Sequence, residues 1–144
     1  MRWLNVVLVM TLAASCTVKP AASRFEWEAA PKITIEILDD HRIRLTAENV
    51  EARAICINAS EWPGPEGRLS GDDFEVIGEQ DAAWRYTGIE KYPTQGGVRI
   101  EPRGRLGSEV NLSKYYVSKV ASDRLAAVKW KLGFVYCDAV SNRS

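Results

Sequence analysis

The residue types that perform most acid–base and metal chemistry are few in this chain. Its one histidine, His41, follows Asp39 and Asp40. These three residue types bind metals or transfer protons, but neighbours on a tight turn do not normally converge on one ion, and short polar residues are usual in turns. The sequence contains no HExxH, CxxC, P-loop, GxSxG or GxGxxG pattern. We therefore expect His41 to lie on a solvated turn, and we assign no metal site, no cofactor and no catalytic residue.

Paired carboxylates offer a second route to chemistry. Asp72 and Asp73 are adjacent, and Glu26 and Glu28 are two residues apart. Such pairs can act as a general acid and a general base. They also occur as solvated charges beside strands, which is the interpretation we prefer here.

The first sixteen residues have the plan of an export signal. Arg2 supplies a positive charge, residues 3–12 are almost all apolar, and residues 13–15 are small. The apolar stretch is shorter than the roughly 20 residues that a membrane-spanning helix needs. The pattern therefore predicts a signal peptide over residues 1–15 that is cleaved before Cys16.

Residues 12–16, Leu-Ala-Ala-Ser-Cys, resemble a bacterial lipobox, with Ala13 where that family more often has leucine. The resemblance implies a diacylglyceryl group on the Cys16 thiol and a fatty acid such as palmitate on the new amino group. Thr17 replaces the aspartate that often retains such lipoproteins at the inner membrane, so we expect the outer membrane, on its periplasmic side. An ordinary secretory signal followed by a chance cysteine is the alternative.

The three cysteines fit an exported protein. If Cys16 carries lipid, Cys56 and Cys137 remain as a pair. Because the periplasm is oxidising, we expect a disulfide between them. In the chain-entropy model, closing so long a loop would stabilise the fold by about 4 to 5 kcal/mol. Two buried free thiols are the alternative.

The remaining sequence predicts a lipidated tether over 16–31, a β-sandwich domain over 32–138 and a flexible tail over 139–144. Phe25 and Trp27 alternate with charged residues and could instead form a first edge strand. Within the domain, residues 114–127 are expected to form a loop with one helical turn. A series of short segments is predicted to form strands. These are residues 33–37, 43–47, 52–59, 74–77, 83–86, 98–100, 110–112 and 128–136. Apolar and polar residues alternate most clearly in 33–37 and 43–47, whereas 52–59 is apolar on both faces and fits a central strand covered on both sides. The fold class expected is all-β, a single antiparallel sandwich.

Aromatic residues in loops are candidates for contact with a partner, because loops on a rigid scaffold carry much of protein recognition. Trp62 begins a loop rich in proline and glycine at 62–71, Tyr92 lies in a second loop, and Tyr115 and Tyr116 lie in a third. Trp84 and Trp130 are expected in the core, and Trp62 could belong to either group.

Three segments resemble the β-sandwich domain that precedes the catalytic domain in deuterolysin-type metallopeptidases. They are 74–77 (FEVI), 84–88 (WRYTG) and 106–116 (LGSEVNLSKYY). The resemblance covers roughly 70–137 and implies an immunoglobulin-like sandwich. The zinc motif of that family is absent from the sequence, so the resemblance transfers no catalytic residue.

Two classes of function follow. The first is a membrane-tethered binding protein without catalysis, such as an inhibitor of an envelope protease or lysozyme, with the loop 62–71 entering the cleft of its target. Its partners would be the lipid bilayer and an envelope protein. Without residues 1–15 the chain has 18 basic and 19 acidic residues, which gives no basic surface for nucleic acid. The alternative is a carboxylate-based envelope enzyme, which needs a cleft with at least two buried carboxylates of raised pKa.

Overall fold

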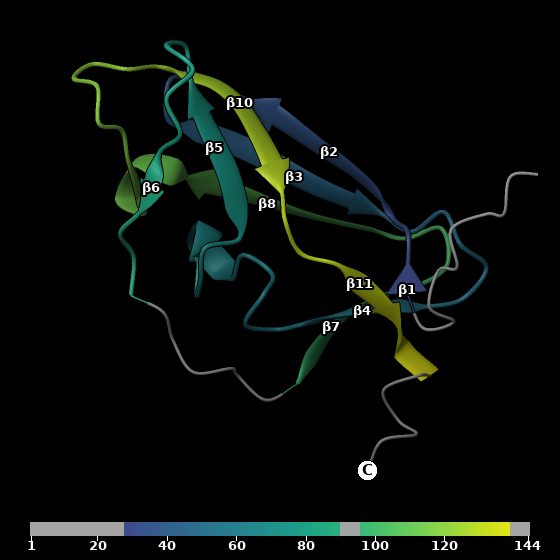
Figure 1. Ribbon diagram of the computed structural model, residues 1–144. Coiled ribbons are helices and arrows are strands. Elements are labelled where there is room, and N and C mark those ends of the chain that lie inside the picture. Colours follow the sequence, from purple (N-terminus) through teal and green to yellow (C-terminus); the bar gives the residue numbers. More distant parts are fainter. Residues whose placement is uncertain (1–27, 90–95, 139–144) are drawn as a thin grey trace, which may run out of the picture.

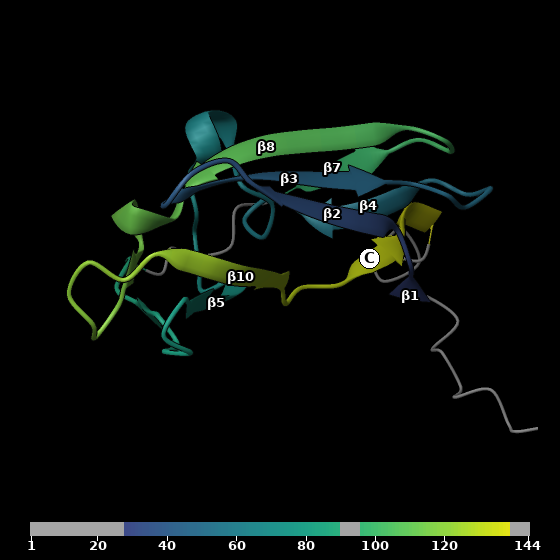
Figure 2. The ribbon, with the colours of Figure 1, turned by 90° about the horizontal axis from the view of Figure 1, so that it is seen from above.

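A computed structural model describes residues 28–89 and 96–138 of the chain, and they form antiparallel sheets in two layers (Figures 1 and 2). One layer is a sheet of β2 (Lys32–Ile37), β3 (Arg42–Glu48) and β8 (Arg105–Asn111), in that order. The other contains the pair β10 (Leu125–Trp130) and β5 (Phe74–Gly78). Figure 2 shows this pair lying across from the β2-β3-β8 sheet. The expected all-β sandwich is confirmed.

Two further sheets complete the described part of the molecule. The larger has the order β1 (Glu28–Ala29), β11 (Phe134–Tyr136), β4 (Ile55–Asn58) and β7 (Gly97–Ile100). The smaller pairs β6 (Arg85–Tyr86) with β9 (Tyr116–Val117). Short 3-10 helices occur at η1 (Pro65–Gly67) and η2 (Leu112–Lys114). None of the helical segments in these two ranges of the chain has the length and apolar character needed to cross a bilayer.

Alternating side chains explain the β2-β3-β8 sheet. On β3, Ile43 and Leu45 are fully buried, whereas Arg42 and Arg44 point to solvent. Successive side chains of a strand point to opposite faces, so this order gives one apolar face and one charged face. The charged face is tied together by Arg44, whose guanidinium lies 3.0 Å from Glu36 on β2 and 2.7 Å from Glu109 on β8.

The core ends in a cluster of four aromatic rings. The Trp130 ring lies 5.2 Å from the Phe74 ring and 5.7 Å from the Trp62 ring, and Trp62 lies 6.1 Å from Phe134. Their tilted and edge-on arrangements are those that aromatic pairs prefer. This cluster fills the space between the loop that precedes β5 and the β10–β11 connection.

Some predicted boundaries were wrong. The strand expected over 128–136 is two strands, because residues 131–133 separate β10 from β11. The loop expected over 114–127 contains β9 and the start of β10, since Tyr116 and Leu125 are buried and anchor both strands in the core. The segment assigned to the tether also contains β1, which pairs with β11.

The disulfide between Cys56 and Cys137 is confirmed, with 5.0 Å between their Cα atoms. Cys56 lies opposite Val135 of β11, and the Cys137 amide donates to the carbonyl of Ala54, 3.1 Å away. The bond therefore joins neighbouring strands of one sheet. It closes a loop across 81 positions of the sequence.

A buried carboxylate organises the far end of β5. Asp123 accepts hydrogen bonds from Trp84 Nε1 and from Ser118 Oγ, each 3.0 Å long. Burial acts to raise the pKa of Asp123, but these donors and nearby backbone amides outweigh it and the pKa is lowered. The carboxylate sits directly against Gly78, where a Cβ would overlap it.

We expect Gly78→Ala to lower the free energy of unfolding by about 1 to 3 kcal/mol, because the added methyl would displace Asp123 from its donors. Gly133→Ala is the matched control, since a Cβ there meets nothing within 4 Å. Urea unfolding followed by tryptophan fluorescence measures both. Equal midpoints for the two variants would contradict this role of Gly78.

Candidate functional site

The Asp39-Asp40-His41 segment forms the turn between β2 and β3, and its contacts are structural. The Asp39 carboxylate accepts hydrogen bonds from the backbone amides of His41 and Arg42, at 2.9 and 2.8 Å. These bonds and the Arg42 side chain lower the pKa of Asp39 to about 2. Asp40 pairs with Arg124 at 2.8 Å. As expected, His41 lies exposed on the turn. Among the described residues, no group of three or more His, Cys, Asp and Glu is placed to hold a metal ion.

The loop 62–71 is anchored in the core by the aromatic residue that was a candidate for partner contact. Trp62 is only 6% exposed and packs against Trp130 and Phe134. The interpretation of Trp62 as a surface contact is therefore corrected: its ring fixes the base of the loop. The two partners come from the end of the chain, so the sequence around Trp62 gave no sign of its burial.

The rest of this loop is held in a tight conformation. The Gly64 amide donates to the Arg68 carbonyl at 2.9 Å, and the Gly67 amide donates to the Gly64 carbonyl at 3.0 Å. Glu66 and Gly67 both adopt positive φ, at 64° and 67°. Gly67 lies so close to β8 that a Cβ would overlap the Glu109 carbonyl, and only glycine fits such a place. The loop therefore covers the outer edge of β8.

A shallow hollow of about 620 Å³ lies beside this loop. Its apolar part comes from Trp62, Pro63, Val98 and Leu106. Glu66 stands at its margin with a side chain that is 83% exposed, and it pairs loosely with Arg68 at 3.7 Å. Apolar hollows with a few polar groups at the margin are common recognition sites. We call residues 62–71 and this hollow the loop site.

The tyrosines that were expected to contact a partner have different surroundings. The Tyr116 hydroxyl is buried, donates to Asp72 and accepts from the Phe74 amide, each at 3.0 Å. Burial raises its pKa. Tyr115 is half-buried and its carbonyl accepts from the Thr87 amide at 2.7 Å. Tyr116 therefore holds the start of β5 in place, and Tyr115 fastens the segment after β6.

Two of the predicted site residues, Cys16 and Tyr92, lie outside the described residues, as does Glu26 of the Glu26/Glu28 pair. Glu28 is exposed on β1. The structure therefore adds nothing to the lipidation site or to the contact role of Tyr92, and both stay predictions.

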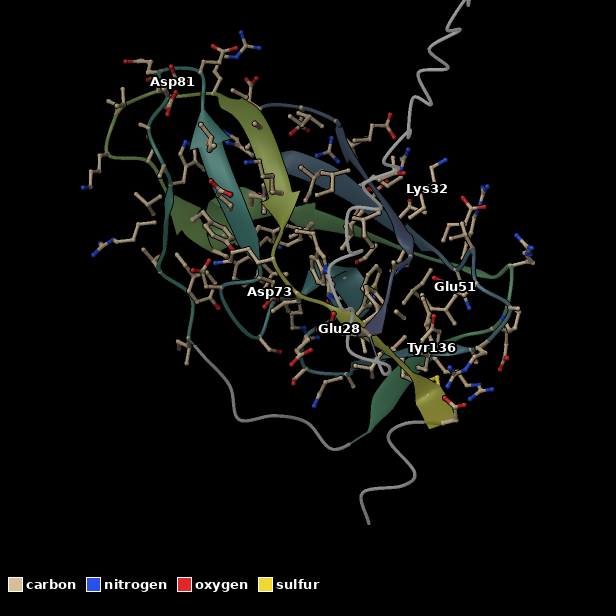
Figure 3. All side chains as sticks on the ribbon, turned by 45° about the vertical axis from the view of Figure 1, so that its right-hand side comes forward. Glu28, Lys32, Glu51, Asp73, Asp81 and Tyr136 are labelled. Atoms are coloured by element: carbon tan, nitrogen blue, oxygen red, sulfur yellow. A yellow bond between two sulfur atoms is a disulfide. The ribbon has the colours of Figure 1, made fainter. Side chains whose placement is uncertain are left out.

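Asp73, just before β5, is an unusual carboxylate (Figure 3). It is 5% exposed, and its Oδ2 has no hydrogen-bond partner among the residues described. Burial raises its pKa to about 6, and the charges of Glu61 and Asp72 act in the same direction, while Lys131 opposes them. Asp72 is exposed and pairs with Lys131 at 2.7 Å. Both adjacent acids were expected to be solvated. Asp72 is solvated, but Asp73 is buried, so the prediction for Asp73 was wrong.

The two buried carboxylates of the described part, Asp73 and Asp123, are shifted in opposite directions. The pKa of Asp73 is raised, whereas that of Asp123 is lowered by its hydrogen-bond donors. A general acid and a general base must face one cleft. Asp73 precedes β5, whereas Asp123 lies against Gly78 at the other end of that strand, so the length of β5 separates the two carboxylates. The loop site is therefore the better supported candidate.

Neither comparison adds a relative: no family model matches the chain, and no curated protein is significantly similar to it in sequence. The resemblance to the sandwich domain of deuterolysin-type metallopeptidases therefore stays a prediction. So does the immunoglobulin-like topology that it implies.

We expect Asp73→Asn to stabilise the protein at pH 7 by on the order of 2 kcal/mol. The pKa of Asp73 is raised in the folded state, from 3.8 to about 6. Protonation of the Asp73 carboxylate therefore favours folding. The stability that protonated Asp73 contributes is fully present below about pH 4 and is lost as the pH rises through about 6. Urea unfolding between pH 3.5 and 8 measures this. In Asp73→Asn, the free energy of unfolding should not show this decrease as the pH rises.

Asp81→Asn is the control for this experiment, because Asp81 is exposed at the turn that follows β5 (Figure 3). Its pH profile should match that of the parent chain. A parental profile for Asp73→Asn as well would show that Asp73 does not titrate in this range.

Proposed function

We propose that this chain is a lipoprotein of the bacterial envelope, anchored through acylated Cys16, whose sandwich domain binds an envelope protein without catalysis. The disulfide is the observation that supports it most. Because Cys56 and Cys137 are bonded to each other, Cys16 is the one cysteine left, and it stands directly behind the segment with the plan of a signal peptide. Disulfides are typical of exported proteins.

The position of β1 fits a domain held by its N-terminus. β1 and β11 are paired, so the chain enters the domain beside its last strand (Figure 1). Eleven residues lie between Cys16, the proposed start of the mature chain, and Glu28, the first residue of β1, and a tether of that length reaches at most about 40 Å. The domain would thus stay close to the membrane surface, on the periplasmic side of the outer membrane.

The loop site supports the binding role. Hydrogen bonds within the loop, the buried Trp62 and the contact of Gly67 with β8 hold its exposed residues in one conformation. A segment that is already ordered loses less conformational entropy on binding. This is the property that an inhibitor of a protease or lysozyme needs in the loop that enters the cleft of its target.

The alternative function, a carboxylate-based envelope enzyme, is favoured by one observation, the raised pKa of buried Asp73. It lacks support from a second buried carboxylate, because Asp123 lies against Gly78 at the other end of β5, where Trp84 and Ser118 hold it. We therefore place the binding role first.

The anchor is tested by Cys16→Ser. Acyl chains hold a protein firmly, since each buried methylene contributes roughly 0.8 kcal/mol. We expect the parent chain to incorporate labelled palmitate and to sediment with outer membranes. The variant should incorporate none and leave the membrane fraction. An unmodified thiol on mature Cys16, found by mass spectrometry, would instead indicate an ordinary secretory signal.

The loop site is tested by a photo-crosslinking amino acid in place of Glu66, in cells that produce the anchored protein. We expect an adduct with one envelope protein. Glu75 is the control position, because it is exposed on β5 and lies outside the loop site. No adduct at position 66, or the same adduct at both positions, would remove the loop site from the proposal.

A further inference from the structure

On one side of the sandwich, two strand edges have no partner strand among residues 28–89 and 96–138. β2 ends the order of the β2-β3-β8 sheet and β10 ends its pair with β5, and Figure 2 shows the two strands one above the other along the same side. Between them lies an open apolar groove of about 630 Å³. It is lined chiefly by Ile33, Ile35, Val128, Trp130 and Leu132. The opposite edge, on β8, is covered by the loop site at Gly67.

The free backbone groups of β2 can be assigned from the ladder. At the β2–β3 turn the Leu38 amide donates to the Arg42 carbonyl at 2.9 Å. Hydrogen-bonded and non-hydrogen-bonded pairs alternate along an antiparallel ladder. Thr34, opposite Thr46, therefore bonds toward β3. The amides and carbonyls of Ile33 and Ile35 consequently face the open side.

The side chains of β2 follow the same alternation. Lys32, Thr34 and Glu36 are exposed on the outer face, whereas Ile33 and Ile35 are half-buried on the groove side. At the end of the strand, Ile37 is 40% exposed and is one of the large apolar residues that the described part leaves at the surface. A long free edge with exposed apolar residues is prone to pair with another strand.

We propose that β2 pairs antiparallel with β2 of a second copy of this chain, with Thr34 on the two-fold axis. This register places Lys32 opposite Glu36 of the second copy, and Glu36 opposite its Lys32. On the groove side, Ile33 meets Ile35 of the second copy, and Ile37 meets its Pro31. Opposite charges and apolar pairs directly across strands stabilise a sheet.

Other registers lose this match. A shift by one residue sets charged side chains against isoleucines, because it turns one strand over. A shift by two residues keeps the faces but sets Lys32 against Thr34 or Leu38, so neither charge meets its opposite. The charge pattern of β2 thus selects one arrangement of two copies.

The arrangement also accounts for the groove. The Ile33 and Ile35 side chains of the second copy would stand beside the groove over Val128, Trp130 and Leu132. Trp130 lines this groove and is only half-buried, so part of its side chain is open to contact with those isoleucines. The two β2-β3-β8 sheets would join into one sheet across a two-fold interface of identical surfaces. This inference does not depend on the lipid anchor or on the loop site.

The register is tested by cysteine cross-linking of the full chain in detergent with oxidised glutathione. Directly opposite residues in a non-hydrogen-bonded pair lie about 4.5 Å apart at Cα, close enough for a disulfide. Thr34→Cys should give at least tenfold more disulfide-linked dimer on a non-reducing gel than the parent chain, which supplies the background.

Two off-axis variants make the test specific. Lys32→Cys alone should stay at background, because the two copies of residue 32 would be about 13 Å apart along the strands. A mixture of Lys32→Cys and Glu36→Cys should give the mixed dimer. Background levels for Thr34→Cys, or equal dimer from Lys32→Cys alone, would overturn the proposal.

Sedimentation of the full chain with its native cysteines tests the charge match. Lys32→Glu should weaken self-association roughly tenfold, because two favourable pairs become repulsive. A parent chain that stays monomeric at all concentrations, or a Lys32→Glu variant that associates as strongly as the parent, would show that this edge serves another partner or none.

Discussion

The pairing of β11 is the interaction on which the position of β1, the first described strand, depends. This strand has three residues, yet it lies between β1 and β4, and it is the strand with which β1 pairs. Two paired residues on each side are too few to hold a strand in water. The Cys56–Cys137 bond removes this weakness, because it keeps the end of β11 beside β4. Through β11 it also keeps β1, and therefore the entry of the chain, attached to the domain.

Local patterns in the sequence were enough to predict the positions of the first long strands and the pairing of the cysteines. Alternation located β2 and β3, since each side chain's direction there follows from the pleat. Counting cysteines paired Cys56 with Cys137, because compartment and number left one partner for each. These inferences required no knowledge of which strands are neighbours.

Features that depend on distant neighbours were missed. Trp62 is buried because Trp130 and Phe134 meet it from the end of the chain. Asp72 and Asp73 are the same residue type side by side, and only the fold decides that one is exposed and the other 5% exposed. The sequence alone does not distinguish the exposed residues of the loop site, such as Glu66, from the buried Trp62 at the base of the loop. The sequence therefore assigned a partner contact to Trp62, the residue that anchors the loop in the core.

The two edges of the β2-β3-β8 sheet carry the two protein contacts that we propose, and both contacts are compatible with the membrane anchor. The β8 edge is covered by the loop, whose exposed residues we propose for contact with another protein, while the β2 edge has no partner strand in the described part of the chain. Two copies joined at β2 would begin their β2 strands about 13 Å apart, and each tether reaches at most about 40 Å. Both anchors could therefore enter the same membrane. Confinement to a membrane would raise the local concentration of copies and so favour even a modest interface of this kind.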